Sequence, residues 1–244
     1  MTIQECKKAA AVYAVDTYIK SGMLLGLGSG TTTFYAIEYL GQKLKRKDVE
    51  NIRCVPTSTA TERLMNQWEI PSIALDELDT LDLVIDGADQ IDQSFNLIKG
   101  LGKALLREKL VAQCTRSYVI IVDETKAKTF ERFLEGPLPV EIVKFGAEHT
   151  VRHLLSQPFL KSLGAKGSFR TNCCEPKDYE ETDNGNFIVD ITFDQPLSDL
   201  VCLSQILNST VGIVEHGLFL NLNPILIVGY EHGDVKCFSP PSLS

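Results

Sequence analysis

The chain has 244 residues, of which 44% are hydrophobic and 23% charged, and its formal net charge is −8. This length allows one large domain or a main domain with a smaller one, and a core of that size needs no disulfide or structural metal. The acidic balance disfavours nucleic acid and anionic membranes as partners, because both select basic surfaces.

Seven cysteines, an odd number without C-x-x-C spacing, indicate reduced thiols and not a disulfide framework. The adjacent pair Cys173 and Cys174 can be redox-active or can be two loop thiols without a role, and the second interpretation is favoured. The first residues lack the basic stretch and apolar run of a signal peptide. No run of about 18 apolar residues predicts a membrane span. We therefore expect a cytoplasmic protein.

Helices and short apolar strands alternate through the first half of the chain. Thr2 and Glu5 have the spacing of a capping box, which predicts that a helix begins there and continues to Ile19. Strands are then expected at 23–25, 52–55, 81–85 and 118–122, with helices at 31–45, 59–68 and 104–115. Short, largely apolar strands between helices are typical of a parallel sheet that is covered on both faces. The pattern predicts an α/β fold with a mostly parallel sheet.

The rhythm changes near Thr129. From there to 207 the expected strands are 140–143, 167–171 and 187–193, and the expected helices are 147–156 and 197–207. This predicts a small α+β domain at 129–207, inserted into an α/β catalytic domain that 1–128 begins and 208–244 completes. Two final strands, at 212–220 and 224–228, are expected to rejoin the main sheet.

Polar segments follow four of the predicted strands, and an open parallel sheet binds ligands beyond the carboxyl ends of its strands. The first, Gly28-Ser29-Gly30-Thr31-Thr32, joins a strand to a helix. Its glycines let backbone N–H groups approach a ligand, and the start of a helix favours an anion. The spacing is neither G-x-G-x-x-G nor a Walker A loop, which counts against NAD and ATP. A phosphate monoester fits this loop, and a plain glycine-rich turn is the alternative.

The second segment, Asp86-Gly87-Ala88-Asp89, directly follows a predicted strand. If the chain turns at the glycine, both carboxylates can face one pocket, where they can bind sugar hydroxyls, pass protons or hold a divalent metal. No histidine is near in sequence and the further ligands of a calcium loop are missing, so sugar and proton chemistry is favoured over a metal. A solvated acidic turn is the alternative. His149 and His153 have i, i+4 spacing but no acidic third ligand, so no zinc site is expected.

The third segment, Lys99-Gly100-Leu101-Gly102, leads into a helix that carries Glu108 on an apolar stripe. A carboxylate in that place is costly to ionise, so its pKa should rise towards neutrality, where a general base works best. The alternative is a glutamate that is paired with a lysine in the core. Lys126 follows the fourth strand, from where it could reach a phosphate, although surface lysines are common.

In this order the segments resemble type A ribose-5-phosphate isomerase over nearly the whole chain. The matching motifs are the phosphate loop at 28–32, D-G-A-D at 86–89, K-G-x-G at 99–102 followed by R-E-K at 107–109, and T-D-N-G-N at 182–186. The spacing of nine between Lys99 and Glu108 is kept. Leu101 and Lys103 interrupt the family's glycine run, and Gln90 replaces its usual acidic residue. Leu101 could narrow the pocket or change the path of the loop.

The resemblance implies an enzyme without cofactor or metal that interconverts D-ribose 5-phosphate and D-ribulose 5-phosphate in the non-oxidative pentose phosphate pathway. It implies that Glu108 moves a proton between C2 and C1 through an enediol-like intermediate, while Asp86 helps to open the sugar ring. Asp89 and Lys99 would hold and polarise the oxygens. The substrate-binding residues that it implies are Ser29, Gly30, Thr31, Thr32, Asp86, Gly87, Ala88, Asp89, Lys99, Gly100, Leu101, Gly102 and Lys126, with Lys8 from the first helix.

The family's fold is a Rossmann-like domain with a small ferredoxin-like domain that serves in assembly, which implies a homodimer or homotetramer. Two other functions are alternatives for a chain with these segments. A sugar-phosphate sensor of the same fold would be expected to carry a basic DNA-binding segment, whereas this chain is acidic and starts with the first helix of the expected catalytic domain. Such a sensor would also have no use for Glu108 beside Lys99. An amino-sugar-phosphate deaminase would be expected to use a histidine, and none lies near these loops.

Overall fold

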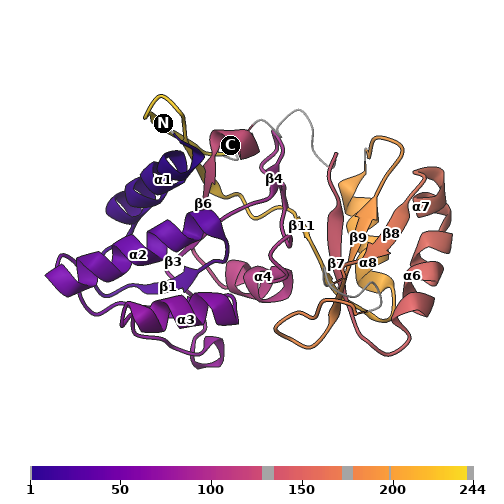
Figure 1. Ribbon diagram of the computed structural model, residues 1–244, viewed down its shortest axis with the longest axis horizontal. Helices are drawn as coiled ribbons and strands as arrows, with labels where there is room; N and C mark the ends of the chain where they lie inside the picture. The colour runs from indigo at the N-terminus through magenta and orange to yellow at the C-terminus, as the bar shows by residue number, and fades with distance from the viewer. Residues whose placement is uncertain (1, 128–134, 172–177, 198, 241–244) are drawn as a thin grey trace.

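The computed structural model describes residues 2–127, 135–171, 178–197 and 199–240. Two units lie side by side, a larger α/β unit and a smaller α+β unit (Figure 1). The fold class that the sequence predicts is confirmed. Within the described residues, no helix combines the length and the apolar character that crossing a membrane requires. The expected domain break at Thr129 and the pair Cys173 and Cys174 lie outside the described residues.

A six-stranded sheet forms the centre of the larger unit. Its order is β13 (Val235–Phe238), β12 (Ile225–Gly229), β6 (Tyr118–Asp123), β3 (Leu83–Asp86), β1 (Leu24–Leu27) and β2 (Arg53–Pro56). Neighbouring strands run parallel, except that the edge strand β13 is antiparallel to β12. The sequence did not predict β13, whose residues are mostly exposed.

Helices cover both faces of this sheet. The helices of the unit are α1 (Ile3–Tyr18), α2 (Thr31–Arg46), α3 (Thr59–Gln67), α4 (Leu105–Gln113), α5 (Glu124–Ala127) and the short 3-10 helix η1 (Leu75–Glu77). Leu25, Ile85 and Ile121 share one core with α1 and α2, whereas Val84 and Ile120 share another with α4. Because successive strand residues point to opposite faces, strands buried on both sides must be apolar throughout. The apolar runs in the sequence have this origin.

The helix boundaries follow the local signals. Thr2 is the N-cap of α1 and forms the expected capping box with Glu5. The N-cap of α2 is Gly30, whose φ of 110° lies in a region that favours glycine, and no side chain caps this helix. The first N–H groups of a helix have no partner within it, so an uncapped helix start leaves donors for a ligand.

The smaller unit is built on an antiparallel sheet in the order β10 (Ile213–His216), β7 (Leu138–Ile142), β9 (Phe187–Thr192) and β8 (Lys166–Phe169). Helices α6 (Ala147–Ser156), α7 (Pro158–Ser162) and α8 (Leu200–Ser209) pack on it through buried side chains such as Val151, Leu160 and Leu203. A three-stranded sheet of β11 (Leu218–Phe219), β5 (Leu97–Ile98) and β4 (Gln90–Ile91) lies between the two units.

The expectation that 212–220 rejoins the main sheet is wrong. Its first part, β10, pairs with β7 in the smaller sheet, and its second part, β11, pairs with β5. Only the last apolar run returns to the main sheet, as β12. A hydrophobic run does not specify its partner strand, so this pairing could not be read from periodicity. We propose that the inserted unit ends after His216 and not at residue 207.

Candidate active site

The expected polar segments meet at one edge of the main sheet. β1, β3 and β6 are parallel neighbours, so their carboxyl ends lie together. A cavity of about 340 Å³ opens there. Its lining residues are Lys7, Ser29, Gly30, Thr31, Thr32, Gly87, Ala88, Asp89, Lys99, Gly100, Gly102, Glu108, Asp123 and Lys126. The four segments that the sequence singled out therefore form one site.

Lys99 lies between two buried carboxylates. Its Nζ is 3.0 Å from Oδ2 of Asp86 and 3.4 Å from Oε1 of Glu108, and it also donates to the backbone oxygen of Gly87. The side chains of Asp86, Lys99 and Glu108 are 0%, 3% and 6% exposed. They come from the end of β3, the loop after β5 and helix α4. Glu108 is thus both paired with a lysine and part of the cavity wall, which combines the two alternatives that its sequence position allowed.

Burial is the main cause of the unusual proton affinities in this cluster. It raises the pKa of Glu108 to about 8, with Asp86 adding to the increase and Lys99 opposing it. Burial also raises the pKa of Asp86, although Lys99 works against it. For Lys99 burial alone would lower the pKa, but the two carboxylates outweigh it and raise the value. The amine therefore stays charged, and Glu108 exchanges its proton near neutral pH, as a general base requires.

Asp86 lies behind the cavity and is not one of its lining residues. Its Oδ1 accepts hydrogen bonds from the N–H groups of Gly87, at 2.7 Å, and Ser29, at 3.3 Å. A Cβ on Gly28 would come within 1.9 Å of the same oxygen, so the carboxylate can occupy this place only beside a glycine. Asp86 thereby joins the phosphate loop to Lys99. Direct contact of Asp86 with a sugar remains an expectation from the resemblance.

The hydroxyl of Ser29 is held by the start of α3. Its Oγ lies 2.9 Å from Oγ1 of Thr57, 2.8 Å from Oγ of Ser58 and 3.3 Å from Oγ1 of Thr61. The hydroxyls of Thr57, Ser58 and Thr61 come from the end of β2 and the first turn of α3. The sequence alone did not indicate this support, because it joins segments almost thirty residues apart.

The cation that α1 contributes to the cavity is Lys7 and not Lys8. Lys7 donates to Oγ1 of Thr31 at 2.8 Å, and its Nζ is 3.8 Å from Oδ2 of Asp123. Lys8 borders a separate surface depression along the outside of α1, so the structure does not bring it to the cavity where the resemblance places it. Successive helix residues differ by about 100° in direction. Lys7 precedes the buried residues Ala10 and Ala11 by three and four positions, which is the signal that could have identified it.

Leu101 does not line the cavity either, so the structure does not bring its side chain to the place that the resemblance implies. Its side chain is 48% exposed, and its N–H donates to Oδ2 of Asp89 at 2.9 Å. Leu101 therefore orients a cavity carboxylate through its backbone and does not narrow the pocket. Lys103, the other departure from the glycine run, has a φ of 63°. The backbone keeps a conformation that favours glycine even though a lysine occupies the position.

This arrangement defines a class of enzyme. A buried carboxylate and ammonium beside an uncapped helix start, at the edge of an α/β sheet, suit proton transfer on a small phosphorylated substrate. Comparison with known proteins gives the particular family. Residues 53–233 match the family described as ribose 5-phosphate isomerase A (phosphoriboisomerase A). The chain belongs to this family.

Individual relatives agree over nearly the full length. Ribose-5-phosphate isomerase A of Desulfatibacillum aliphaticivorans is 42% identical over 234 residues, which cover 96% of this chain and 97% of the relative. The structure of ribose 5-phosphate isomerase from Plasmodium falciparum superimposes with a TM-score of 0.90 at 36% identity, covering 98% and 99% of the two chains. A D-ribose-5-phosphate isomerase solved in complex with phospho-erythronic acid gives a TM-score of 0.87 at 36% identity, with 98% and 100% covered.

Proposed function

We propose that Glu108 transfers the proton when this isomerase interconverts D-ribose 5-phosphate and D-ribulose 5-phosphate. The observation that carries the proposal is the place of Glu108, buried in the cavity wall with its Oε1 3.4 Å from the ammonium of Lys99. In the open-chain aldose, Glu108 would take the proton from C2 as the electrons move to the carbonyl oxygen on C1. Returning that proton to C1 while the O2 proton passes to O1 gives the ketose.

Lys99 supports the proposal through its charge. Removal of a proton beside a carbonyl produces an oxyanion, and a preorganised cation can stabilise such a charge by several kcal/mol. Asp86 keeps the amine of Lys99 in place from behind the cavity. The carboxylate of Asp89, which the N–H of Leu101 orients, would accept a hydrogen bond from a hydroxyl of the sugar. Asp86 reaches the cavity only through Lys99, so it would not contact the sugar by itself. We therefore assign the ring-opening step that the resemblance implies to Asp86 and Asp89 jointly.

The phosphate would bind at the other end of the cavity. The uncapped start of α2 provides backbone N–H groups, and Lys7 and Lys126 provide positive charge. Holding the phosphate there fixes C1 and C2 opposite Glu108, and such positioning can supply a large part of the rate enhancement.

The test is to incubate the purified protein with D-ribose 5-phosphate and to follow formation of D-ribulose 5-phosphate. Glu108→Gln keeps the shape of the side chain but cannot accept the proton, so kcat should fall by about 10²- to 10⁴-fold while substrate affinity measured by calorimetry is retained. The matched control is Glu50→Gln, because Glu50 is exposed and its backbone oxygen accepts from Gly22, before the start of β1, whereas the cavity lies at the carboxyl end of that strand. A Glu108→Gln enzyme as active as wild type would rule out this residue as the base.

We also propose that the enzyme is a cytoplasmic homodimer or homotetramer, as the resemblance implies. Phe145 and Val211 support self-association, because these apolar side chains are 94% and 93% exposed. They lie on adjacent loops of the inserted unit, where the N–H of Val143 donates to the oxygen of Gly212. The test is the molar mass in solution by light scattering, for wild type and for the Phe145→Ser, Val211→Ser double variant. A monomeric wild-type protein would contradict this proposal.

A further inference from the structure

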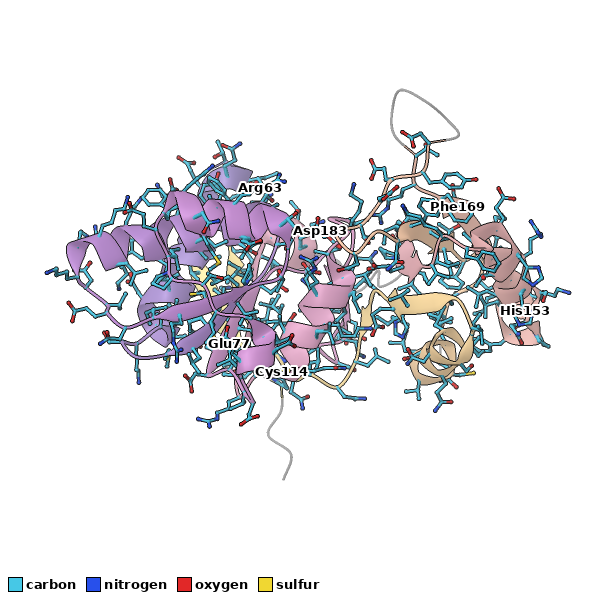
Figure 2. All side chains as sticks on the ribbon, turned by 90° about the horizontal axis from the view of Figure 1, so that it is seen from below. Arg63, Glu77, Cys114, His153, Phe169 and Asp183 are labelled. Atoms are coloured by element: carbon cyan, nitrogen blue, oxygen red, sulfur yellow. The ribbon has the colours of Figure 1, made fainter. Side chains whose placement is uncertain are left out.

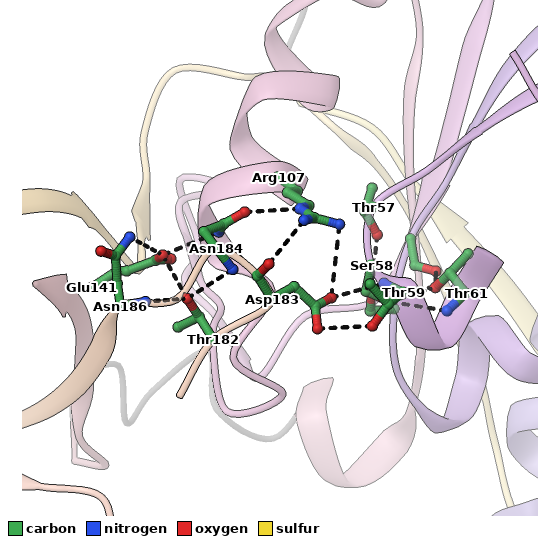
Figure 3. A network of polar contacts seen from close by, with 12 residues as sticks. Thr57, Ser58, Thr59, Thr61, Arg107, Glu141, Thr182, Asp183, Asn184 and Asn186 are labelled. Carbon is green, nitrogen blue, oxygen red and sulfur yellow. Dashed lines mark hydrogen bonds and ion pairs between the residues drawn. The ribbon is translucent and has the colours of Figure 1, made fainter. Parts of the chain in front are cut away.

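The turn at 182–186 joins the inserted unit to the active site (Figure 3). It is anchored on Glu141 of β7, whose side chain is fully buried. One oxygen of Glu141 accepts hydrogen bonds from the hydroxyl of Thr182, at 2.9 Å, and from the amides of Asn184 and Asn186, at 3.0 and 2.9 Å. Three donors on one buried carboxylate oxygen hold the turn in a single conformation.

From this anchored turn, Asp183 reaches the start of α3 in the larger unit. Its Oδ2 accepts the N–H of Thr59 at 2.7 Å, and its Oδ1 accepts the hydroxyl of Thr59 at 2.8 Å. A carboxylate is favoured at this end of a helix, where unpaired N–H groups carry partial positive charge. Partial burial works against ionisation of Asp183, but the hydrogen bonds from Thr59 outweigh it and lower the pKa of Asp183.

The same first turn of α3 holds Ser29 of the phosphate loop through Ser58 and Thr61.

The turn also contacts the helix that carries the proposed base. Arg107, next to Glu108 on α4, donates through Nε to Oδ1 of Asn184 at 2.9 Å and through Nη2 to the backbone oxygen of Asp183 at 3.1 Å. Figure 2 shows Asp183 at the junction of the two units. A single turn is therefore bonded at once to the phosphate side and to the proton-transfer side of the cavity.

We propose that Asp183 is a positioning residue, which fixes the phosphate loop relative to Glu108 by joining the start of α3 to α4. The inference rests on the proposed function. A substrate held by its phosphate at one end presents C1 and C2 correctly only if the two ends of the cavity keep their separation. A displacement of about 1 Å can reduce a rate by 10²-fold, so a contact outside the cavity can control turnover.

The geometry predicts different kinetic signatures on the two sides of the turn. Asp183→Ala removes two hydrogen bonds from the start of α3, which holds Ser29 of the phosphate loop. It should therefore raise KM for ribose 5-phosphate by about tenfold. Arg107→Met releases the α4 side and should lower kcat severalfold with little change in KM. Asp183→Asn keeps one acceptor for Thr59 and should recover part of the lost affinity.

The control for charge removal in the same unit is Asp194→Asn, because Asp194 is exposed and paired only with Lys166 at 2.9 Å among the contacts that the structure describes. Wild-type KM and kcat are expected for it. Thr59→Val removes the hydroxyl half of the contact and tests the inference even if Asp183→Ala does not fold, with an expected rise in KM of about threefold. Combining Thr59→Val with Asp183→Asn should cost less than the sum of the two changes, because both act on one contact.

Two failures can be told apart. A wild-type protein without isomerase activity would overturn the proposed function and this inference with it. An active wild-type protein whose Asp183→Asn and Thr59→Val variants keep normal KM and kcat would overturn the inference alone. A fall in the apparent kcat of the Asp183 variants that matches their fraction of unfolded protein, with KM unchanged, would also overturn it, since it indicates a purely structural role.

Discussion

The two units of the molecule take part in the active site in different ways. The described residues that line the cavity, from Lys7 to Lys126, all belong to the α/β unit. The inserted α+β unit contacts these segments from outside. Arg170, at the end of β8, donates to the backbone oxygens of Gly100 and Leu101, both at 2.9 Å. One unit supplies the side chains that line the cavity, and the other holds the segments that carry them.

The R-E-K motif shows the same division within three residues. Arg107 binds the turn at 182–186, whereas Lys109 binds the other side of the inserted unit, donating to the backbone oxygen of His216 and to Oε1 of Glu215, both at 2.6 Å. Glu108 between them faces the cavity. The motif therefore contains one cavity residue and two anchors, and a short helix bonded on both sides can rotate little. The proposed chemical and positioning roles can therefore be tested in separate units.

The largest effect that would test the role of the α/β unit is the pH dependence of stability. The pKa of Glu108 rises from an ordinary 4.5 to about 8, mainly through burial, so the folded protein keeps a proton that the unfolded chain releases. The resulting stability is complete below the unfolded pKa and is lost as the pH rises through about 8. Glu108→Gln cannot ionise, so its stability relative to wild type should improve between pH 5 and pH 9 by a few kcal/mol, on the order that such a shift implies.

Urea unfolding at several pH values measures this difference. Glu50→Gln, at an exposed position, should follow the wild-type profile throughout. If Glu108→Gln and wild type lose stability in parallel as the pH rises, Glu108 does not hold a proton in the folded state. Glu108 would then be one half of an ordinary core ion pair and not a group that exchanges its proton near neutral pH.

The next effect tests the inserted unit. Arg170 is mostly buried and pairs with both oxygens of Asp190 at 2.6 Å. It also donates to the backbone oxygens of Gly100 and Leu101, in the loop that begins at Lys99. Arg170→Met should lower the free energy of unfolding by about 2 kcal/mol, because charged hydrogen bonds are lost and Asp190 is left unpaired. It should also lower kcat, because Lys99 begins that loop. Arg152→Met is the control, since Arg152 is 70% exposed and should change stability by less than about 0.5 kcal/mol.

A smaller effect separates the cavity cations from their neighbours. Lys126→Ala and Lys7→Ala should each raise KM for ribose 5-phosphate by about tenfold with little change in kcat, because a lost phosphate contact weakens ground state and transition state alike. Lys8→Ala is a closely matched control, one residue further along α1 but bordering a different depression. An unchanged KM in Lys126→Ala would remove that lysine from the phosphate site.

The smallest expected effect lies where the two units meet. Lys103 has a φ of 63°, and its Nζ is 3.0 Å from Oε2 of Glu180 in the inserted unit. Lys103→Gly relieves a backbone conformation that costs a side chain about 1 kcal/mol, and it loses a partly exposed ion pair of about 0.5 kcal/mol. A net gain of about 0.5 kcal/mol in unfolding free energy is expected. Glu180→Gln removes only the pair and should be slightly destabilising. A net loss in Lys103→Gly would show that the contact between the units outweighs the backbone strain.

Local patterns explain how much of this protein could be predicted. The capping box at Thr2, the apolar strands and the glycine-rich loop depend on neighbours a few residues away, and each is found within a few residues of its expected position. The collection of polar segments at one edge also follows from sequence, because parallel strands end on the same side. The position of Glu108 on an apolar stripe predicts that its pKa is raised, which agrees in direction with the effect of its burial.

Other features depend on contacts between distant segments. The choice of Lys7 over Lys8 depends on how α1 is rotated against the sheet, and the pairing of β10 with β7 depends on which apolar edge is available. Nothing near Asp183 in the sequence indicates that it reaches Thr59, which is 124 residues away. Such contacts form only after both units have folded.

Periodicity and loops of a few residues are enough to predict the α/β alternation, the edge of the sheet where the polar segments gather and the residue types available there. Tertiary packing alone places Asp86 behind Lys99, brings the N–H of Leu101 to Asp89 and bonds the inserted unit to α4. The physical reason is that hydrogen-bond geometry and burial depend on side chains brought together from different elements, and their distances are set by packing and not by spacing along the chain.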